Sequence, residues 1–99
     1  MMVNISFHNV ERSESLEHFI QEKSKLLSRF LNGPEHLNWV MNSDSKKFSP
    51  HLEIVLSGQN HMIKSEHENV FKAVDNISAK AKRLLSDRHG RRSRHSLAT

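Results

Sequence analysis

The chain has 99 residues, 35% of them hydrophobic, with no cysteine and a formal net charge of +4. This length suffices for one domain with a modest core. The lack of cysteine excludes disulfide bonds and thiolate metal sites. No apolar run reaches the length of a membrane span, and the N-terminus lacks the apolar segment of a signal peptide. We therefore expect a cytoplasmic protein with no membrane partner.

The charge is unevenly distributed along the chain. Residues 1–45 hold four Lys or Arg and six acidic residues, giving −2, whereas residues 46–99 hold eleven and five, giving +6. This asymmetry favours a polyanionic partner, such as a nucleic acid, on one side of the molecule. A solvated basic surface without a partner is the alternative.

The first half of the sequence predicts a strand and a helix. Apolar and polar residues alternate over residues 3–7, as in a half-buried strand. Ser13 is the expected N-cap of the helix, and residues 32–34 (Asn-Gly-Pro) are expected to end it. The apolar stripe of this helix is formed by Leu16, Phe19, Ile20, Leu27, Phe30 and Leu31.

Three more strands are predicted in the middle of the chain. Apolar residues alternate over residues 37–42 and again over 51–57, and the polar residues 43–47 are expected to connect these strands. Residues 57–60 have the composition of a hairpin turn. The fourth strand, about residues 61–66, lacks clean alternation because Met62 and Ile63 are adjacent.

A second helix is predicted from residue 69 to about residue 87. Its N-cap is either Asn69 or Ser65, the latter in a capping box with Glu68. Apolar residues recur at helical spacing on one side, and a second line on the opposite side includes two cations. The apolar stripe contains Val70, Val74, Ile77, Ala81 and Leu84, and the opposite line contains Lys72, Asn76, Ala79 and Arg83.

Beyond this helix the sequence is basic and almost free of apolar residues. Gly90 is expected to end the helical pattern, so residues 1–89 form the predicted domain and residues 90–99 a basic, flexible tail. Lys80 and Lys82 flank the two stripes of the helix. The cations near and in the tail are Arg88, Arg91, Arg92 and Arg94.

The predicted element order is β-α-β-β-β-α. The first two strands are joined through a helix and are expected to lie parallel, whereas the later connections are short enough for antiparallel neighbours. Each helix has one apolar stripe, and both are expected to cover the same face of a four-stranded sheet. The fold class is therefore α+β, a two-layer sandwich.

No motif in the sequence indicates catalysis, a metal site or a cofactor. The eight histidines have no recognised ligand spacing, and the three glycines form no phosphate-binding loop. Most of the six aromatic residues fall on predicted core positions, which favours phosphate contact by Lys and Arg over base stacking. A ribonuclease with two converging histidines and a protein-binding module remain as alternatives.

The element order, length and helix sequence resemble the ribosome hibernation-promoting factor family, also called ribosome-associated inhibitors. The resemblance covers roughly residues 2–89 and is most specific in ENVFKAVDNISAKAKRLL. There Phe71 takes the place of a family Tyr, residues 73–75 that of Ala-Ile-Asp, and Lys80 and Arg83 those of a Lys and an Arg. Residues 87–89 take the place of Lys-His-Lys, where Asp87 departs from the pattern.

The resemblance implies a double-stranded-RNA-binding-like fold. It also implies that the protein occupies the decoding channel of the small ribosomal subunit, where it contacts 16S-type ribosomal RNA. In this way it would silence idle ribosomes in stationary phase or stress. It implies a short family member that is a monomer when free, with no enzymatic activity and no small-molecule substrate. It leaves open whether the protein promotes or opposes ribosome pairing. The expected RNA-binding residues are Lys72, Lys80, Lys82, Arg83, Arg88, His89, Arg91, Arg92 and Arg94.

Overall fold

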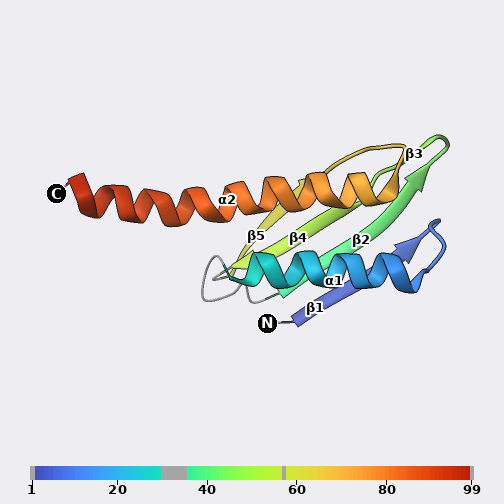
Figure 1. Ribbon diagram of the computed structural model, residues 1–99, viewed down its shortest axis with the longest axis horizontal. Helices are drawn as coiled ribbons and strands as arrows, with labels where there is room; N and C mark the ends of the chain where they lie inside the picture. The colour runs from blue at the N-terminus through green and yellow to red at the C-terminus, as the bar shows by residue number, and fades with distance from the viewer. Residues whose placement is uncertain (1, 30–35, 57, 99) are drawn as a thin grey trace.

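The computed structural model describes residues 2–29, 36–56 and 58–98, and for residues 87–98 it describes the backbone alone. The described chain contains two helices and five strands (Figure 1). In order they are β1 (Met2–His8), α1 (Glu14–Ser28), β2 (His36–Asp44), β3 (Lys47–Phe48), β4 (His51–Leu56), β5 (Gln59–Lys64) and α2 (Val70–Ala98).

The strands form one mixed sheet in the order β1-β2-β4-β5. β1 and β2 are parallel, whereas β2 with β4 and β4 with β5 are antiparallel. The predicted α+β class is thus confirmed, but the predicted four strands become five. The added strand β3 lies at the end of the segment assigned to a connection, where Lys47 and Phe48 pair with Asp44 and Ser43. Two residues are too few for a pattern of alternation, so the sequence did not reveal this strand.

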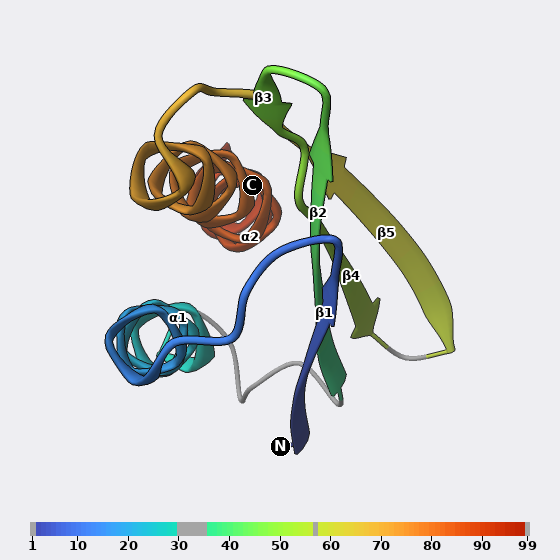
Figure 2. The same cartoon turned by 90° about the vertical axis from the view of Figure 1, so that its right-hand side faces the viewer.

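Both helices lie on the same side of the sheet, and the opposite face of the sheet is uncovered (Figure 2). The helices run side by side in the same direction, from right to left in Figure 1. The core fills the layer between them and the sheet, and Trp39 lies within it. The indole Nε1 of Trp39 donates to Ser24 Oγ at 2.9 Å, and Ser24 Oγ donates to the carbonyl of Ile20 at 2.8 Å.

The predicted apolar stripes supply most of this core. Phe19 is the exception among the central positions of α1, because it is only partly buried. The buried hydrophobic cluster consists of Leu16, Ile20, Leu27, Leu37, Trp39, Met41, Leu52, Ile54, Leu56, Val74, Ile77, Ala81 and Leu85.

The helix N-termini have side-chain caps. Ser13 Oγ accepts a hydrogen bond from the backbone N–H of Leu16 at 3.0 Å, which confirms the predicted N-cap of α1. Asn69 Oδ1 accepts from the N–H of Phe71 at 2.9 Å, so Asn69, and not Ser65, caps α2. Helix α1 ends at Ser28, and the predicted stop at residues 32–34 and the apolar positions 30 and 31 lie outside the described residues.

The hairpin between β4 and β5 has the predicted position but a shifted second strand. Gly58 has φ +78° and lies between the two strands, a conformation that a residue with a Cβ atom rarely adopts. β5 spans Gln59–Lys64, two residues earlier than expected. Its alternation is present, because His61 and Ile63 are partly buried while Met62 is 52% exposed.

Helix α2 continues to Ala98, so the prediction that Gly90 ends it is wrong for the backbone. A single glycine costs a helix about 1 kcal/mol relative to alanine, but it stops the helix only where a left-handed turn follows. The residues around Gly90 include Arg88, Arg91 and Arg92, and arginine favours helix. The second half of α2 therefore projects past the sheet (Figure 1), and the molecule measures 51 × 23 × 22 Å.

Candidate nucleic-acid interface

The cations in the first half of α2 are exposed because the apolar residues of the helix occupy its other side. Ala73, Val74 and Ile77 are fully buried against the sheet and α1, and this fixes the rotation of the helix about its axis. The described cations that were predicted to contact RNA are all exposed: Lys72, Lys80, Lys82 and Arg83.

These four cations point in different directions and do not form a single patch. Lys80 Nζ donates to the backbone carbonyl of Lys64 at 2.9 Å, so this side chain extends towards β5. Lys82 lines a groove on the side of α1. Lys72 and Arg83 are eleven residues apart, about three helical turns, and lie on the outward line of the helix. The helix therefore presents positive charge over a wide arc.

The other predicted RNA-binding residues also belong to α2. The backbone of Arg88, His89, Arg91, Arg92 and Arg94 is helical, and their side chains lie outside the described part of the structure. Over Val70–Ala98 the helix sequence holds eight Lys or Arg and two Asp, giving +6. A helix of 29 residues is about 43 Å long. It thus concentrates positive charge on one long element.

The two helices meet along a seam that the sequence did not predict. Phe19 and Phe71 pack edge to face with ring centroids 5.2 Å apart, and Phe71 stays 38% exposed. One turn further along both helices, Lys23 Nζ and Asp75 Oδ1 form an ion pair at 2.8 Å. These pairs show that the parallel helices are in register.

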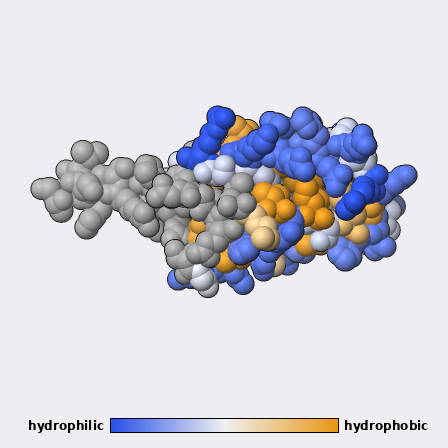
Figure 3. Space-filling view, turned by 90° about the horizontal axis from the view of Figure 1, so that it is seen from below, coloured by the Kyte–Doolittle hydropathy of each residue, from blue (hydrophilic) through white to orange (hydrophobic). Residues whose placement is uncertain are grey.

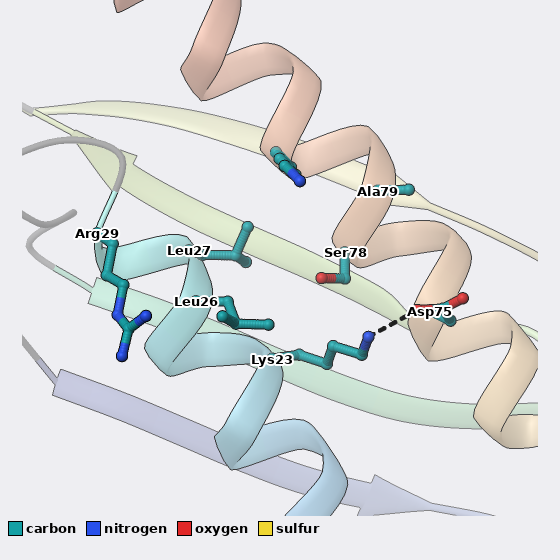
Figure 4. A pocket seen from close by; sticks show the side chains of 8 residues that line it. Lys23, Leu26, Leu27, Arg29, Asp75, Ser78 and Ala79 are labelled. Carbon is teal, nitrogen blue, oxygen red and sulfur yellow. Dashed lines mark ion pairs between the residues drawn. The ribbon is translucent and has the colours of Figure 1, made fainter.

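Beyond the ion pair the seam opens into a groove with a volume of about 450 Å³ (Figure 4). Its lining from α1 includes cations that were not among the predicted site residues. Sequence analysis missed them because α1 has a mixed charge and nothing in the sequence shows that its last turns face α2. The groove is lined by Lys23, Leu26, Leu27, Arg29, Asp75, Ser78, Ala79 and Lys82.

The surfaces away from α2 have a different character. On the open face of the sheet, Asn4 Nδ2 donates to Asn38 Oδ1 at 2.9 Å, and Asn38 Nδ2 donates to Glu53 Oε1 at 3.0 Å. This ladder contains a carboxylate and no cation. Seen from below, the side on which α1 and β1 lie shows a band of hydrophobic residues between hydrophilic ones (Figure 3). Neither surface matches a polyanion as α2 does.

The described histidines do not form a metal site. Among the described residues, no group of three or more His, Asp or Glu is placed to hold a metal ion. His67 Nδ1 accepts the backbone N–H of Asn69 at 2.9 Å, and His18 Nε2 lies 3.9 Å from Glu22 Oε1. The first contact lies just before the N-terminus of α2, and the second lies on the exposed surface of α1. Within the same described ranges, no helix combines the length and apolar character needed to cross a membrane.

The fold and the interface together define a small α+β domain with a long, positively charged helix, a combination suited to binding nucleic-acid phosphates. The chain belongs to the family described as "Sigma 54 modulation protein / S30EA ribosomal protein", which it matches over residues 3–93.

Relatives of this chain are found among both sequences and structures. It is 27% identical over 85 residues to the ribosome hibernation promoting factor of Azotobacter vinelandii, a match that covers 86% of this chain and 79% of that protein. A ribosomal subunit interface protein from Coxiella burnetii has a similar fold, with TM-score 0.79, 18% identity, and coverage of 91% and 99% of the two chains. The N-terminal domain of Thermus thermophilus Protein Y also has TM-score 0.79, with 17% identity and coverage of 88% and 98%.

Proposed function

We propose that this protein binds the small ribosomal subunit and keeps idle ribosomes inactive. The observation that carries the proposal is α2, one helix with a sequence charge of +6 whose second half projects past the sheet. Membership of the S30EA ribosomal protein family supports it, as does the similarity to a relative named as a ribosome hibernation promoting factor. The protein acts in the cytoplasm, where ribosomes are, under starvation or stress.

Inhibition in this proposal needs only occupancy of the decoding channel. A narrow channel in ribosomal RNA has phosphates on several sides, and α2 presents Lys72, Lys80 and Lys82 in different directions. Phosphate contacts fix position and orientation without base recognition, as suits a target that is recognised by shape. The two-layer arrangement with an uncovered sheet face supports the likeness to double-stranded-RNA-binding domains.

The proposed RNA contacts divide between the two halves of α2. Lys72, Lys80, Lys82 and Arg83 lie on the half that packs against the sheet. Arg88, His89, Arg91, Arg92 and Arg94 belong to the projecting half, and we propose that this half reaches deeper into the RNA. Residues 1–89 are then the ribosome-binding domain and residues 90–99 a basic extension of it.

A sucrose-gradient profile of stationary-phase cells with and without the gene tests this function. We expect the protein to co-sediment with small subunits or whole ribosomes, and its loss to change the fraction of ribosomes that are inactive or paired. The profile also shows whether the protein promotes or opposes pairing. Absence of the protein from all ribosomal fractions would contradict the proposal.

The description of the family also names modulation of sigma 54, which makes a protein-binding module the second candidate. In that function, the cations of α2 contact an acidic protein surface instead of RNA. The same gradient separates the two candidates, because a transcription regulator sediments apart from ribosomes. A ribonuclease, the enzyme alternative, would release cleaved RNA from purified subunits.

A further inference from the structure

Phe71 places an aromatic side chain on the surface of α2, where the seam between the two helices begins. It is 38% exposed, and it is the only aromatic residue among the exposed large hydrophobic residues that the structure describes. The others are Met2, Leu26 and Met62, which have no ring. Phe71 therefore gives the helix of the proposed RNA contacts a flat apolar group that is partly in water.

Helix α1 restrains the ring of Phe71. The ring packs edge to face with Phe19, at a centroid distance of 5.2 Å and an interplanar angle of 79°. Lys23 Nζ lies 5.2 Å from the centroid of Phe19 and also pairs with Asp75, which joins the two helices (Figure 4). An edge-to-face contact uses the edge of one ring and one face of the other. At least one face of Phe71 is therefore not used by Phe19.

The charges around Phe71 favour contact with a base over contact with phosphates alone. Glu66 and Glu68 precede the helix and are exposed, and Lys72 follows Phe71 and is also exposed. The attraction of phosphates is therefore weaker here than further along α2. A base is uncharged and stacks on an aromatic ring. Lys72 can contact a nearby phosphate at the same time, because consecutive Cα atoms are about 3.8 Å apart.

We propose that Phe71 stacks on one unpaired base of the RNA that α2 contacts. This inference rests on the proposed function and adds to it a contact that does not depend on charge. RNA is favoured over a protein partner because Phe71 lies on the helix of the proposed phosphate contacts, directly before Lys72. Every base has an aromatic face, so stacking does not require a particular sequence and suits a target that is recognised by shape.

Replacing the ring of Phe71 tests the inference, with the affinity for purified small subunits measured at several salt concentrations. Phe71→Leu keeps an apolar side chain against Phe19 but removes the ring. We expect it to weaken binding about fivefold or more, the loss that removal of one stacked base causes. The salt dependence should stay unchanged, because no charge is removed. Phe71→Tyr keeps the ring and should bind within about twofold of the unchanged protein.

Met2→Ala is the matched control, because Met2 is also an exposed hydrophobic residue but lies on β1. We expect it to bind as the unchanged protein does, and circular dichroism checks that all variants are folded at the temperature of the measurement. The inference is overturned if Phe71→Leu binds as well as Met2→Ala. It is also overturned if Phe71→Tyr loses as much affinity as Phe71→Leu, because the retained ring would then make no difference.

A second measurement uses the unchanged protein without ribosomes. It decides the inference even if no binding to small subunits is found, the result that contradicts the proposed function. We expect a single-stranded adenosine trinucleotide to shift the ring NMR signals of Phe71 saturably, with these signals assigned by their loss in Phe71→Leu. Absence of the shift would overturn the inference. A shift caused by a polyglutamate peptide but not by the trinucleotide would assign Phe71 to a protein partner and overturn it as well.

Discussion

The two halves of α2 have the same secondary structure and different surroundings. In the first half, Val74, Ile77 and Leu85 are fully buried, so tertiary packing stabilises the helix there. The second half projects past the sheet, and its sequence after residue 86 contains Leu97 but no Val, Ile, Phe or Met (Figure 1). The comparison indicates that one continuous helix has two tasks, with stability contributed by the first half and additional positive charge by the second.

The largest expected effect is on the core contact of the first half. Ile77→Ala should lower the free energy of unfolding by about 2–5 kcal/mol, because Ile77 is fully buried between the sheet and the helices. A domain of this size has about 5–15 kcal/mol in total, so thermal denaturation will detect the loss. Leu97→Ala in the second half is the control, with an expected change below about 0.5 kcal/mol. Equal losses in both variants would mean that the second half also packs on the fold.

The next prediction concerns the charge of the first half. Reversing Lys72 and Arg83 to Glu should weaken binding to small subunits at least tenfold and flatten its salt dependence by about two units, because two phosphate contacts are lost. Both residues are exposed, so the melting temperature should stay unchanged. The control reverses Lys46 and Lys47, which are exposed just before and at the start of β3 and give the same change in net charge. Equal weakening by both pairs would show an effect of net charge alone.

The smallest effect distinguishes a helical second half from a flexible one. Gly90→Ala should increase the helix content of the second half, because alanine is more favourable than glycine in a helix by up to about 1 kcal/mol. Gly90→Pro should break the helix at this position, because proline is about 3 kcal/mol less favourable than alanine. Circular dichroism at 222 nm measures both changes. If binding depends on a rigid helix, Gly90→Pro weakens it although every charge is kept. Identical spectra for the three proteins would mean that this segment is not helical in solution.

The periodicity of apolar residues was sufficient to predict the strands and the buried side of α2, because these features depend on residues close together in the sequence. The alternation around Trp39 and Ile54 identified their strands, and the stripe through Val74 and Ile77 identified the buried side of α2. Ser13 was recognised as a cap because its chemistry is local. Such features need only neighbours in sequence.

Features that depend on tertiary geometry were missed. The seam between Lys23 and Asp75 requires two parallel helices in register, which neither helix sequence encodes alone. The edge-to-face contact of Phe71 with the partly buried Phe19 was likewise not predicted, because it joins residues on two different helices. The extension past Gly90 was missed because the glycine was interpreted as the end of the helix. A single glycine costs a helix only about 1 kcal/mol relative to alanine, and the helix continues through it.

The most direct test of the account compares the full chain with a chain that ends at Asp87, by co-sedimentation with purified small subunits at two ionic strengths. The shorter chain lacks Arg88, Arg91, Arg92 and Arg94, and we expect it to keep its melting temperature because it retains every α2 residue that the structure describes as buried, the last of which is Leu85. We predict a partial loss of affinity that is larger at low salt, since screening weakens the contribution of these charges at high salt. Equal binding by both chains at both ionic strengths would contradict the claim that the second half of α2 contacts the ribosome.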